Sequence, residues 1–270
     1  MAIITLMTDF GIKDGNVGVM KGVIWNISPA TQIADLSHMI GPQNIREAAL
    51  ILSRSAPYFP RGTIHMVVVD PGVGTARRPM AARIGEALYV GPDNGIITPL
   101  LERARAERQS CEFVQLDNPS YRLPKVSYVF HGRDIFAPAA GHLAGGVPLS
   151  SLGTSFKDPV EIPFPKPVRT SHGLRGEVIH IDHFGNIASN IRVEDLGDAM
   201  SRKEQIVVKI AQAEIKGMVN TFGERPEGEL IALLGSTGNL IVSVVNGSAA
   251  HTLQAKVGDA LEATLPAPVR

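Results

Sequence analysis

The chain has 270 residues, of which 44% are hydrophobic and 19% charged, a composition typical of a globular protein with one large domain or two ordinary ones. Lys plus Arg and Asp plus Glu both number 26, so the net charge is zero and does not favour a nucleic-acid-binding or anionic-membrane surface. The single cysteine, Cys111, excludes an intrachain disulfide framework and a cysteine-rich metal site.

The first residues have no basic segment before Asp9, which argues against a signal peptide, and no apolar run is long enough to span a bilayer. We therefore expect a cytoplasmic protein with no nucleic-acid partner and no membrane association.

Strand-like and helix-like patterns alternate through the first half of the chain. Strands are expected over 3–7, 32–36, 63–69, 87–91 and 112–116, and helices over 14–27, 42–58, 96–107 and 130–145. This alternation predicts an α/β domain over 1–156, with a mostly parallel sheet and helices on both faces.

The pattern changes in the second half. Residues 157–170 are rich in proline and predict an extended linker. After it come short apolar runs separated by turns that contain Gly, Asp and Asn, which predict a small all-β barrel or sandwich over 171–270.

The segment 63–78 is the most informative stretch of the chain. An apolar, β-branched run up to Val69 reads as a buried strand, and it breaks at once into Asp70-Pro71-Gly72-Val73-Gly74. In open α/β sheets, ligands bind at the carboxyl ends of the strands, where Asp70 is expected. A plain turn would have a similar local pattern.

Two other acids, Asp9 and Asp93, also follow predicted strands. Clustered carboxylates repel one another, so they require cations or hydroxyl donors beside them. The candidate donors beside these carboxylates are Arg77 or Arg78, His131, Arg133 and a bound ligand. His131 heads a predicted helix, a pattern that fits N-terminal capping as well as catalysis. Neither a GxGxxG motif nor a P-loop occurs, so an ordinary NAD or ATP site is not supported.

The second half contains two polar loops. Asp182, Phe184 and Asn186 lie in a Gly-containing turn, which is either a simple β-turn or a purine site where the ring stacks and the amide reads the base edge. The loop 235–239 is either a hairpin turn or a carboxylate grip. His180 and His183 flank Asp182 without a recognised ligand spacing, so no metal site is expected.

Five motifs together resemble the S-adenosyl-L-methionine (SAM) hydrolase, or hydroxide adenosyltransferase, family, which is related to the fluorinases and chlorinases. They are MTDFG (7–11), VDPGVGTAR (69–77), GPDNG (91–95), FHGRD (130–134) and DHFGN (182–186). The resemblance implies an α/β domain followed by a β-barrel, and a homotrimer that binds SAM where one subunit's first domain meets its neighbour's second. It also implies hydrolysis of SAM to adenosine and L-methionine without a cofactor.

The resemblance further implies individual roles. Asp70, Arg77 and His131 match the family's catalytic set. Asp9 matches the acid that holds the ribose, Asp182 the acid that takes the methionine ammonium, and Ser236 part of the carboxylate grip. The expected substrate-binding residues are Asp9, Asp14, Asp93, Asn94, Phe130, Asp182, Phe184, Asn186, Phe222 and Ser236.

Three departures from the halogenating relatives concern Asp70, Val73 and Gly132, which stand where those enzymes have a Tyr and a hydroxyl-lined halide pocket. A desolvated halide beside Asp70 would be repelled, which favours water as the nucleophile. Thr237 stands where the halogenases have an Arg, so the partner of the methionine carboxylate is left open. A SAM-dependent halogenase of the same fold and a non-catalytic adenosine or SAM sensor are the alternatives.

Overall fold

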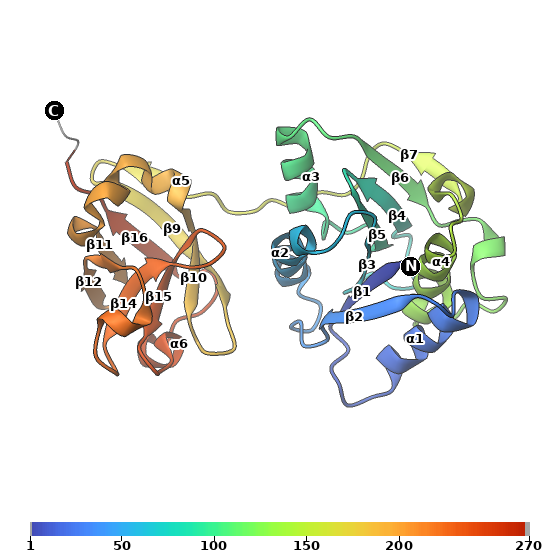
Figure 1. The fold of residues 1–270 in the computed structure, drawn as a ribbon, viewed down its shortest axis with the longest axis horizontal. Helices are drawn as coiled ribbons and strands as arrows, with labels where there is room; N and C mark the ends of the chain where they lie inside the picture. The colour runs from blue at the N-terminus through green and yellow to red at the C-terminus, as the bar shows by residue number, and fades with distance from the viewer. Residues whose placement is uncertain (1, 268–270) are drawn as a thin grey trace. The chain divides into compact units, whose positions relative to one another are not determined.

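The computed structural model describes residues 2–267 and separates the chain into two compact domains (Figure 1). The first ends at Pro163 and the second begins at Phe164, a division that falls inside the segment expected as a linker. Each domain is described by itself below.

A seven-stranded sheet forms the centre of the N-terminal domain, in the order β2-β1-β3-β5-β4-β6-β7. The first four strands in this order are mutually parallel, and the pairs from β5 to β7 are antiparallel. The strands are β1 (Ile3–Thr8), β2 (Gln32–Ser37), β3 (Ile64–Val68), β4 (Pro79–Ile84), β5 (Ala87–Pro92), β6 (Cys111–Gln115) and β7 (Thr154–Phe156).

Both faces of this sheet are covered by helices, as expected. Side chains alternate along each strand, so Leu6 packs into one apolar cluster with α1 and α4, and Met7 packs into another with α2 and α3 (Figure 1). The helices are α1 (Asn16–Ile27), α2 (Ile45–Ser55), α3 (Thr98–Ala106) and α4 (Ala137–Ala144), with short turns η1 (Ala56–Tyr58), η2 (Pro119–Tyr121), η3 (Gly132–Phe136) and η4 (Leu149–Leu152).

The sheet is mixed, which corrects the expectation of a mostly parallel one. The strand β4 was missed because it follows the Asp70 loop directly and is joined to β5 by a very short turn. Gly85 in that turn has a φ of +57°, which favours glycine, and Ile84 pairs with Ala87 across it. The strands therefore form a hairpin where the alternation suggested a crossover.

All four helices of this domain begin later than the pattern suggested, and α2 and α4 are shifted most. The Asn44 side chain accepts a hydrogen bond from the Glu47 backbone N–H at 3.1 Å, so α2 starts at Ile45 rather than near Pro42. The helix expected from 130 onward begins with a π-helical turn, η3, and becomes α-helical only at Ala137. Such π-helical turns are frequent at functional sites.

The C-terminal domain is a single nine-stranded, nearly closed, barrel-like sheet with one large apolar cluster and a smaller one that includes Ile231 and Leu233. Its main path runs β12-β11-β16-β9-β10-β15-β14-β13, and β8, from the end of the expected linker, pairs with β9. The elements are β8 (Val168–Thr170), β9 (Gly173–Ile181), β10 (Ile187–Arg192), α5 (Val193–Leu196), η5 (Gly197–Gln205), β11 (Val207–Ile210), β12 (Ala213–Lys216), β13 (Met218–Val219), η6 (Phe222–Glu224), β14 (Leu230–Leu234), β15 (Asn239–Val244), α6 (Ala249–Leu253) and β16 (Ala260–Thr264).

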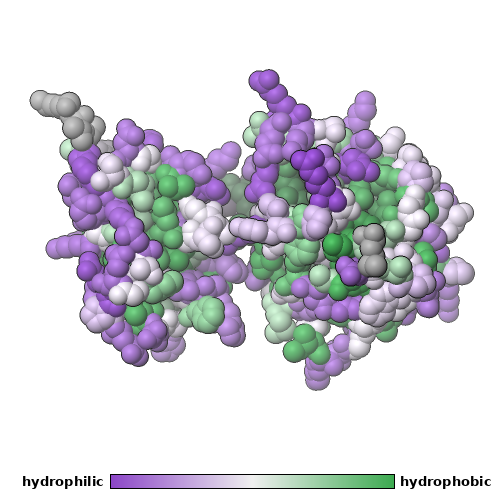
Figure 2. All heavy atoms as spheres, in the orientation of Figure 1, coloured by the Kyte–Doolittle hydropathy of each residue, from purple (hydrophilic) through white to green (hydrophobic). Residues whose placement is uncertain are grey.

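Across residues 2–267, none of the helices combines the length and hydrophobicity needed to cross a bilayer. The face drawn in Figure 2 mixes hydrophilic side chains with separate hydrophobic patches on both domains.

Candidate active site

The carboxyl edge of the parallel strands gathers the three acids singled out in the sequence. Asp9, Asp70 and Asp93 follow β1, β3 and β5, which are parallel neighbours in the sheet. Because these strands end at the same edge, the three carboxylates emerge on one side of the domain. The hydrogen-bond partners of the three carboxylates differ, and their roles therefore differ as well.

Asp70 forms a buried, two-point ion pair with Arg77. The Arg77 Nε donates to Asp70 Oδ1 at 2.9 Å, and its Nη2 donates to Oδ2. Only 5% of the Asp70 side chain and 7% of the Arg77 side chain are exposed. The loop between them is tight, since a Cβ on Gly72 would lie 3.3 Å from the Arg77 Cβ. The pairing is therefore built by the same short loop that ends β3.

His131 joins this pair from a distant part of the chain. Its Nδ1 lies 3.1 Å from Arg77 Nη2. A guanidinium can only donate, so Nδ1 must accept, and the neutral ring then has its hydrogen on Nε2. His131 immediately precedes η3, whose Gly132 packs so tightly that a Cβ there would lie 2.8 Å from the Met20 sulfur. This close packing fixes the backbone position from which the His131 imidazole extends.

Arg77 retains one unused donor group. Nε and Nη2 serve Asp70 and His131, whereas the buried Nη1 has no hydrogen-bond partner within residues 2–267. A buried N–H without an acceptor costs free energy, so such a group is usually satisfied by water or a ligand. The Asp70–Arg77–His131 cluster therefore has a vacant, positively charged hydrogen-bonding position.

Burial and charge shift the pKa values of the two titratable partners in opposite directions. Burial raises the pKa of Asp70, although the charge of Arg77 opposes this shift. Burial, together with the nearby Arg77 charge, lowers the pKa of His131 below its ordinary value of 6.5. The imidazole is consequently neutral at pH 7, which agrees with its role as an acceptor.

Three other expected binding residues lie on the N-terminal domain. Asp9 Oδ2 accepts a hydrogen bond from the Gln43 backbone N–H at 2.8 Å. Asp14 is exposed just before α1. The Phe130 ring packs edge-on against Phe10, with centroids 5.9 Å apart, next to His131. Their contacts with substrate remain predictions.

Asp93 and Asn94 are held by internal contacts. Asp93 Oδ2 accepts from Arg78 Nε at 2.8 Å, and Oδ1 accepts from the Val160 backbone N–H at 2.8 Å. Asn94 Nδ2 donates to the Val69 carbonyl at 2.9 Å, beside Asp70. Asp93 thus fastens the segment near 160 to the sheet edge, and Asn94 supports the backbone of the Asp70 loop. Their predicted contacts with substrate are untested.

The sequence did not indicate the structural role of a further acid, Asp134. Asp134 is fully buried, and its Oδ2 accepts a hydrogen bond from the Ser127 backbone N–H at 2.8 Å. Arg133 Nε donates to its other oxygen at 2.6 Å. Asp134 therefore holds the loop that leads into His131. The available signal was the FHGRD motif, in which Asp134 directly follows Arg133.

In the C-terminal domain, the turn between β9 and β10 contains Asp182, Phe184 and Asn186. Asp182 Oδ1 accepts from the backbone N–H groups of Phe184 and Asn186 at 2.9 Å each, and Oδ2 accepts from Asn186 Nδ2 at 2.7 Å. Gly185, with a φ of +82°, lies directly against Ser248. This rigid turn leaves the Phe184 ring 72% exposed. An exposed aromatic on a fixed turn is a ready stacking surface.

The remaining expected residues lie elsewhere on this domain. Phe222 in η6 is 41% exposed. Ser236 is exposed in the β14–β15 hairpin, which reaches β10 at the Arg192–Asn239 pair, whereas Asp182 lies at the opposite end of β10. Beside this hairpin is the guanidinium of Arg192, whose Nη2 would lie 3.7 Å from a Cβ on Gly238 and whose Nε donates to Glu194 at 3.0 Å. The sequence motifs did not identify this cation.

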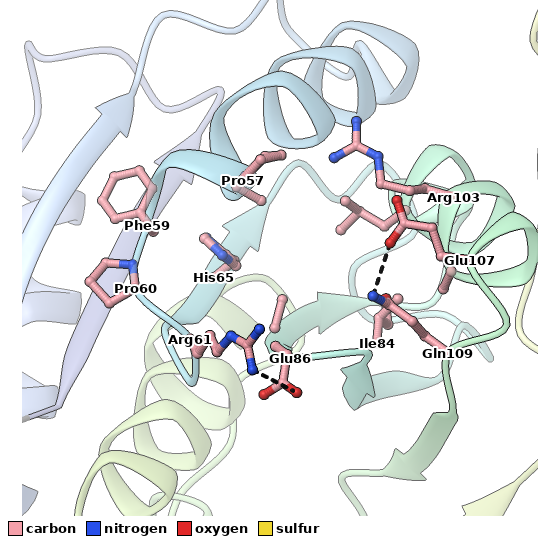
Figure 3. Close-up of a pocket in the computed structure, with 14 residues that line it drawn as sticks. Pro57, Phe59, Pro60, Arg61, His65, Ile84, Glu86, Arg103, Glu107 and Gln109 are labelled. Carbon is pink, nitrogen blue, oxygen red and sulfur yellow. Dashed lines mark hydrogen bonds and ion pairs between the residues drawn. The ribbon is translucent and has the colours of Figure 1, made fainter.

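A separate cavity of about 290 Å³ lies at the amino end of β3, away from Asp70 (Figure 3). Phe59 and Pro57 line it with His65, whose pKa burial lowers to about 4. His65 Nδ1 is 2.7 Å from Thr5 Oγ1, so the ring is a structural part of the core. No group of three or more His, Cys, Asp or Glu side chains suited to a metal ion occurs in the part of the chain that the structure describes.

Comparison with known proteins agrees with this two-domain arrangement. Residues 4–153 match the SAM hydroxide adenosyltransferase N-terminal domain, and residues 176–262 match the corresponding C-terminal domain. An (R)-S-adenosyl-L-methionine hydrolase from Salinispora tropica is 39% identical over 266 residues, which is 97% of each chain.

More distant and structural matches lead to the same family. A fluorinase from Actinoplanes sp. is 31% identical over 224 residues, covering 73% of this chain and 74% of the fluorinase. The crystal structure of an uncharacterized conserved protein from Thermotoga maritima superposes with a TM-score of 0.89 at 35% identity, covering 97% of this chain and 99% of that one. With both domains matched in order, as the five motifs predicted, the chain belongs to the SAM hydroxide adenosyltransferase family.

Proposed function

We propose that this protein hydrolyses SAM to adenosine and L-methionine by in-line attack of water or hydroxide on the ribose C5′. The observation that supports this most directly is the buried Asp70–Arg77–His131 cluster with its unused Arg77 Nη1 donor. The closer similarity to a SAM hydrolase than to a fluorinase supports the choice of oxygen nucleophile.

In the proposed reaction, water first loses a proton to solvent, and the resulting hydroxide forms the oxygen–C5′ bond of neutral adenosine as the C5′–sulfur bond breaks and its electron pair leaves with the methionine sulfur. The sulfonium is already a good leaving group, so the protein has to supply a positioned nucleophile in a dry site. Arg77 Nη1 donates to that oxygen, and its buried charge favours hydroxide over water. The reaction requires no cofactor.

His131 is assigned a positioning role. Because its Nδ1 already accepts from Arg77 Nη2, the ring holds the guanidinium in place and does not itself remove the proton. Asp70 pairs with the same guanidinium. It therefore both compensates the buried charge of Arg77 and fixes the orientation of that group.

This role predicts different outcomes for two substitutions of His131. In His131→Asn, the side-chain Oδ1 takes over the acceptor position of Nδ1, so kcat falls by less than about tenfold. In His131→Leu, Arg77 loses a partner and kcat falls by roughly 100-fold. Steady-state rates with SAM measure both. Equal losses in the two variants would instead identify the imidazole as the general base.

The pKa shifts predict the acidic limb of the pH profile. The pKa of His131 lies below 6.5, so its charge change, and the loss of its bond to Arg77, occur only as the pH falls below that value. We expect kcat/KM to decrease with falling pH with an apparent pKa under 6.5. In His131→Asn, this decrease should occur at lower pH. An acidic limb centred above 6.5 would contradict the assignment.

For substrate binding, we propose that Phe184 stacks on adenine with Asn186 beside it, and that Asp9 holds the ribose hydroxyls. We propose that the protein is a cytoplasmic homotrimer in which the N-terminal domain of one subunit and the C-terminal domain of its neighbour share each site. The exposed Phe184 ring is consistent with a surface that is completed by another copy.

The deciding experiment incubates the purified protein with SAM in ¹⁸O-labelled water, with and without chloride, followed by liquid chromatography–mass spectrometry. We expect adenosine labelled at the 5′ oxygen, together with methionine, whether or not chloride is present. A 5′-chloroadenosine product would establish a halogenase instead, and unchanged SAM despite saturable binding would establish a sensor.

A further inference from the structure

Cavities outside the Asp70 cluster differ in their balance of charges. In the cavity of Figure 3, Arg61 pairs with Glu86 at 3.7 Å, whereas Arg103 donates to the Ser53 carbonyl at 3.4 Å and has no carboxylate partner within residues 2–267. A cavity of about 270 Å³ beside β12 is lined by charged side chains that also pair, including Arg225 with Glu229 at 3.3 Å. A third cavity is the largest of these three, at about 830 Å³, and neither of its two arginines has a carboxylate partner within residues 2–267.

This third cavity lies on the C-terminal domain and is lined by residues of β8, η5, the end of α5 and the end of β16. Arg169 comes from β8 and Arg202 from η5, so segments more than thirty residues apart in the chain supply the two guanidinium groups. We refer to it as the Arg169–Arg202 cavity.

Both guanidinium groups contact only backbone carbonyls. Arg202 Nη2 donates to the Ala267 carbonyl at 2.7 Å, and Arg169 Nη2 donates to the Asp195 carbonyl at 3.2 Å. Within residues 2–267, neither arginine forms an ion pair with a carboxylate. The Arg202 Nε is buried and has no hydrogen-bond partner there. Among residues 2–267, no carboxylate compensates either charge, and the Arg202 Nε is available for an acceptor.

We propose that the Arg169–Arg202 cavity binds a phosphate-bearing small molecule, separately from the SAM site. Guanidinium groups match phosphate oxygens in geometry and charge, and two arginines line this cavity. The hydroxyls of Thr170, Ser171 and Ser201 also line the cavity and provide neutral donors around such an anion. The volume accommodates more than a single phosphate group.

One acid, Asp198, lines the same cavity and has no cationic partner within the described part of the chain. Its charge opposes an anion, so it limits the affinity of the site. Removing Asp198 should therefore strengthen phosphate binding, whereas removing either arginine should weaken it.

The test uses the full-length protein and isothermal titration calorimetry with inorganic pyrophosphate, followed by ADP to ask whether a nucleotide is accepted. We expect saturable binding that weakens by roughly tenfold or more in Arg202→Gln and in Arg169→Gln. In Asp198→Asn, we expect binding to tighten by about threefold. Because none of these residues belongs to the Asp70 cluster, SAM turnover should be unchanged in all three variants.

Arg175→Gln is the matched control, since it also removes one positive charge from the same domain. Arg175 is 62% exposed, lies outside the cavity lining and faces Glu262 at 3.6 Å. Its pyrophosphate affinity should equal that of the wild type. The proposal is overturned if no saturable binding occurs, or if Arg175→Gln weakens binding as much as Arg202→Gln does. Melting temperatures and SAM turnover identify any variant that fails to fold.

Discussion

Replacing Asp70 by asparagine is expected to lower kcat for SAM by roughly 1000-fold while KM changes by less than about threefold. The amide has almost the shape of the carboxylate but no charge, and its N–H₂ group would face the donors of Arg77. Arg77 is only 7% exposed, so its charge would be left uncompensated in the interior and its direction lost. Steady-state kinetics and a binding isotherm with SAM separate the two effects.

Asp158→Asn is the matched control for this substitution. Asp158 also accepts a hydrogen bond from an arginine, Arg78, at 2.9 Å, but its side chain is 81% exposed. Exposed pairs contribute little, so kcat should stay within about twofold of the wild type. A large rise in KM with unchanged kcat in Asp70→Asn would move Asp70 from the reaction to substrate binding.

Mixing two inactive variants is expected to restore activity if each site is shared between subunits, as proposed. One variant is Asp70→Asn. The other carries Phe184→Ala and Phe222→Ala, which remove two exposed rings without opening the core. At SAM concentrations well below KM, the second variant should lose about 30-fold to 20,000-fold in kcat/KM, because stacking contributes roughly 1–3 kcal/mol per ring and two rings are removed.

In co-expressed, randomly mixed cyclic oligomers, about one quarter of the shared sites would combine an intact Asp70 with intact Phe184 and Phe222. Activity should therefore rise to about one quarter of the wild-type value, far above the average of the two variants. Mixing the proteins after separate purification, without subunit exchange, is the control. Activity that stays at the average of the two variants would place each site within a single chain.

Asp182 and Asn186 show how far local sequence information reaches. The Asp-His-Phe-Gly-Asn stretch predicted a turn, and the turn is held by bonds between residues two and four apart. Likewise, the break after Val69 correctly located Asp70 at a strand end, because Pro71 and Gly72 act on their own backbone. The strand β4 was missed because its pairing with β5 and β6 is decided between segments.

The sequence by itself determined five apolar strands of the first domain, the turns that follow Asp70 and Asp182, and the five motifs that identify the family. Only the tertiary structure decided that His131 meets Arg77 across 54 residues, that Asp93 binds the backbone of Val160, and that Arg169 and Arg202 line one cavity without an ion pair to a carboxylate among residues 2–267. The physical reason is the range of the interactions. Backbone preferences and short turns depend on neighbouring residues, whereas ion pairs and unpaired buried donors depend on which distant segments the packed core brings together.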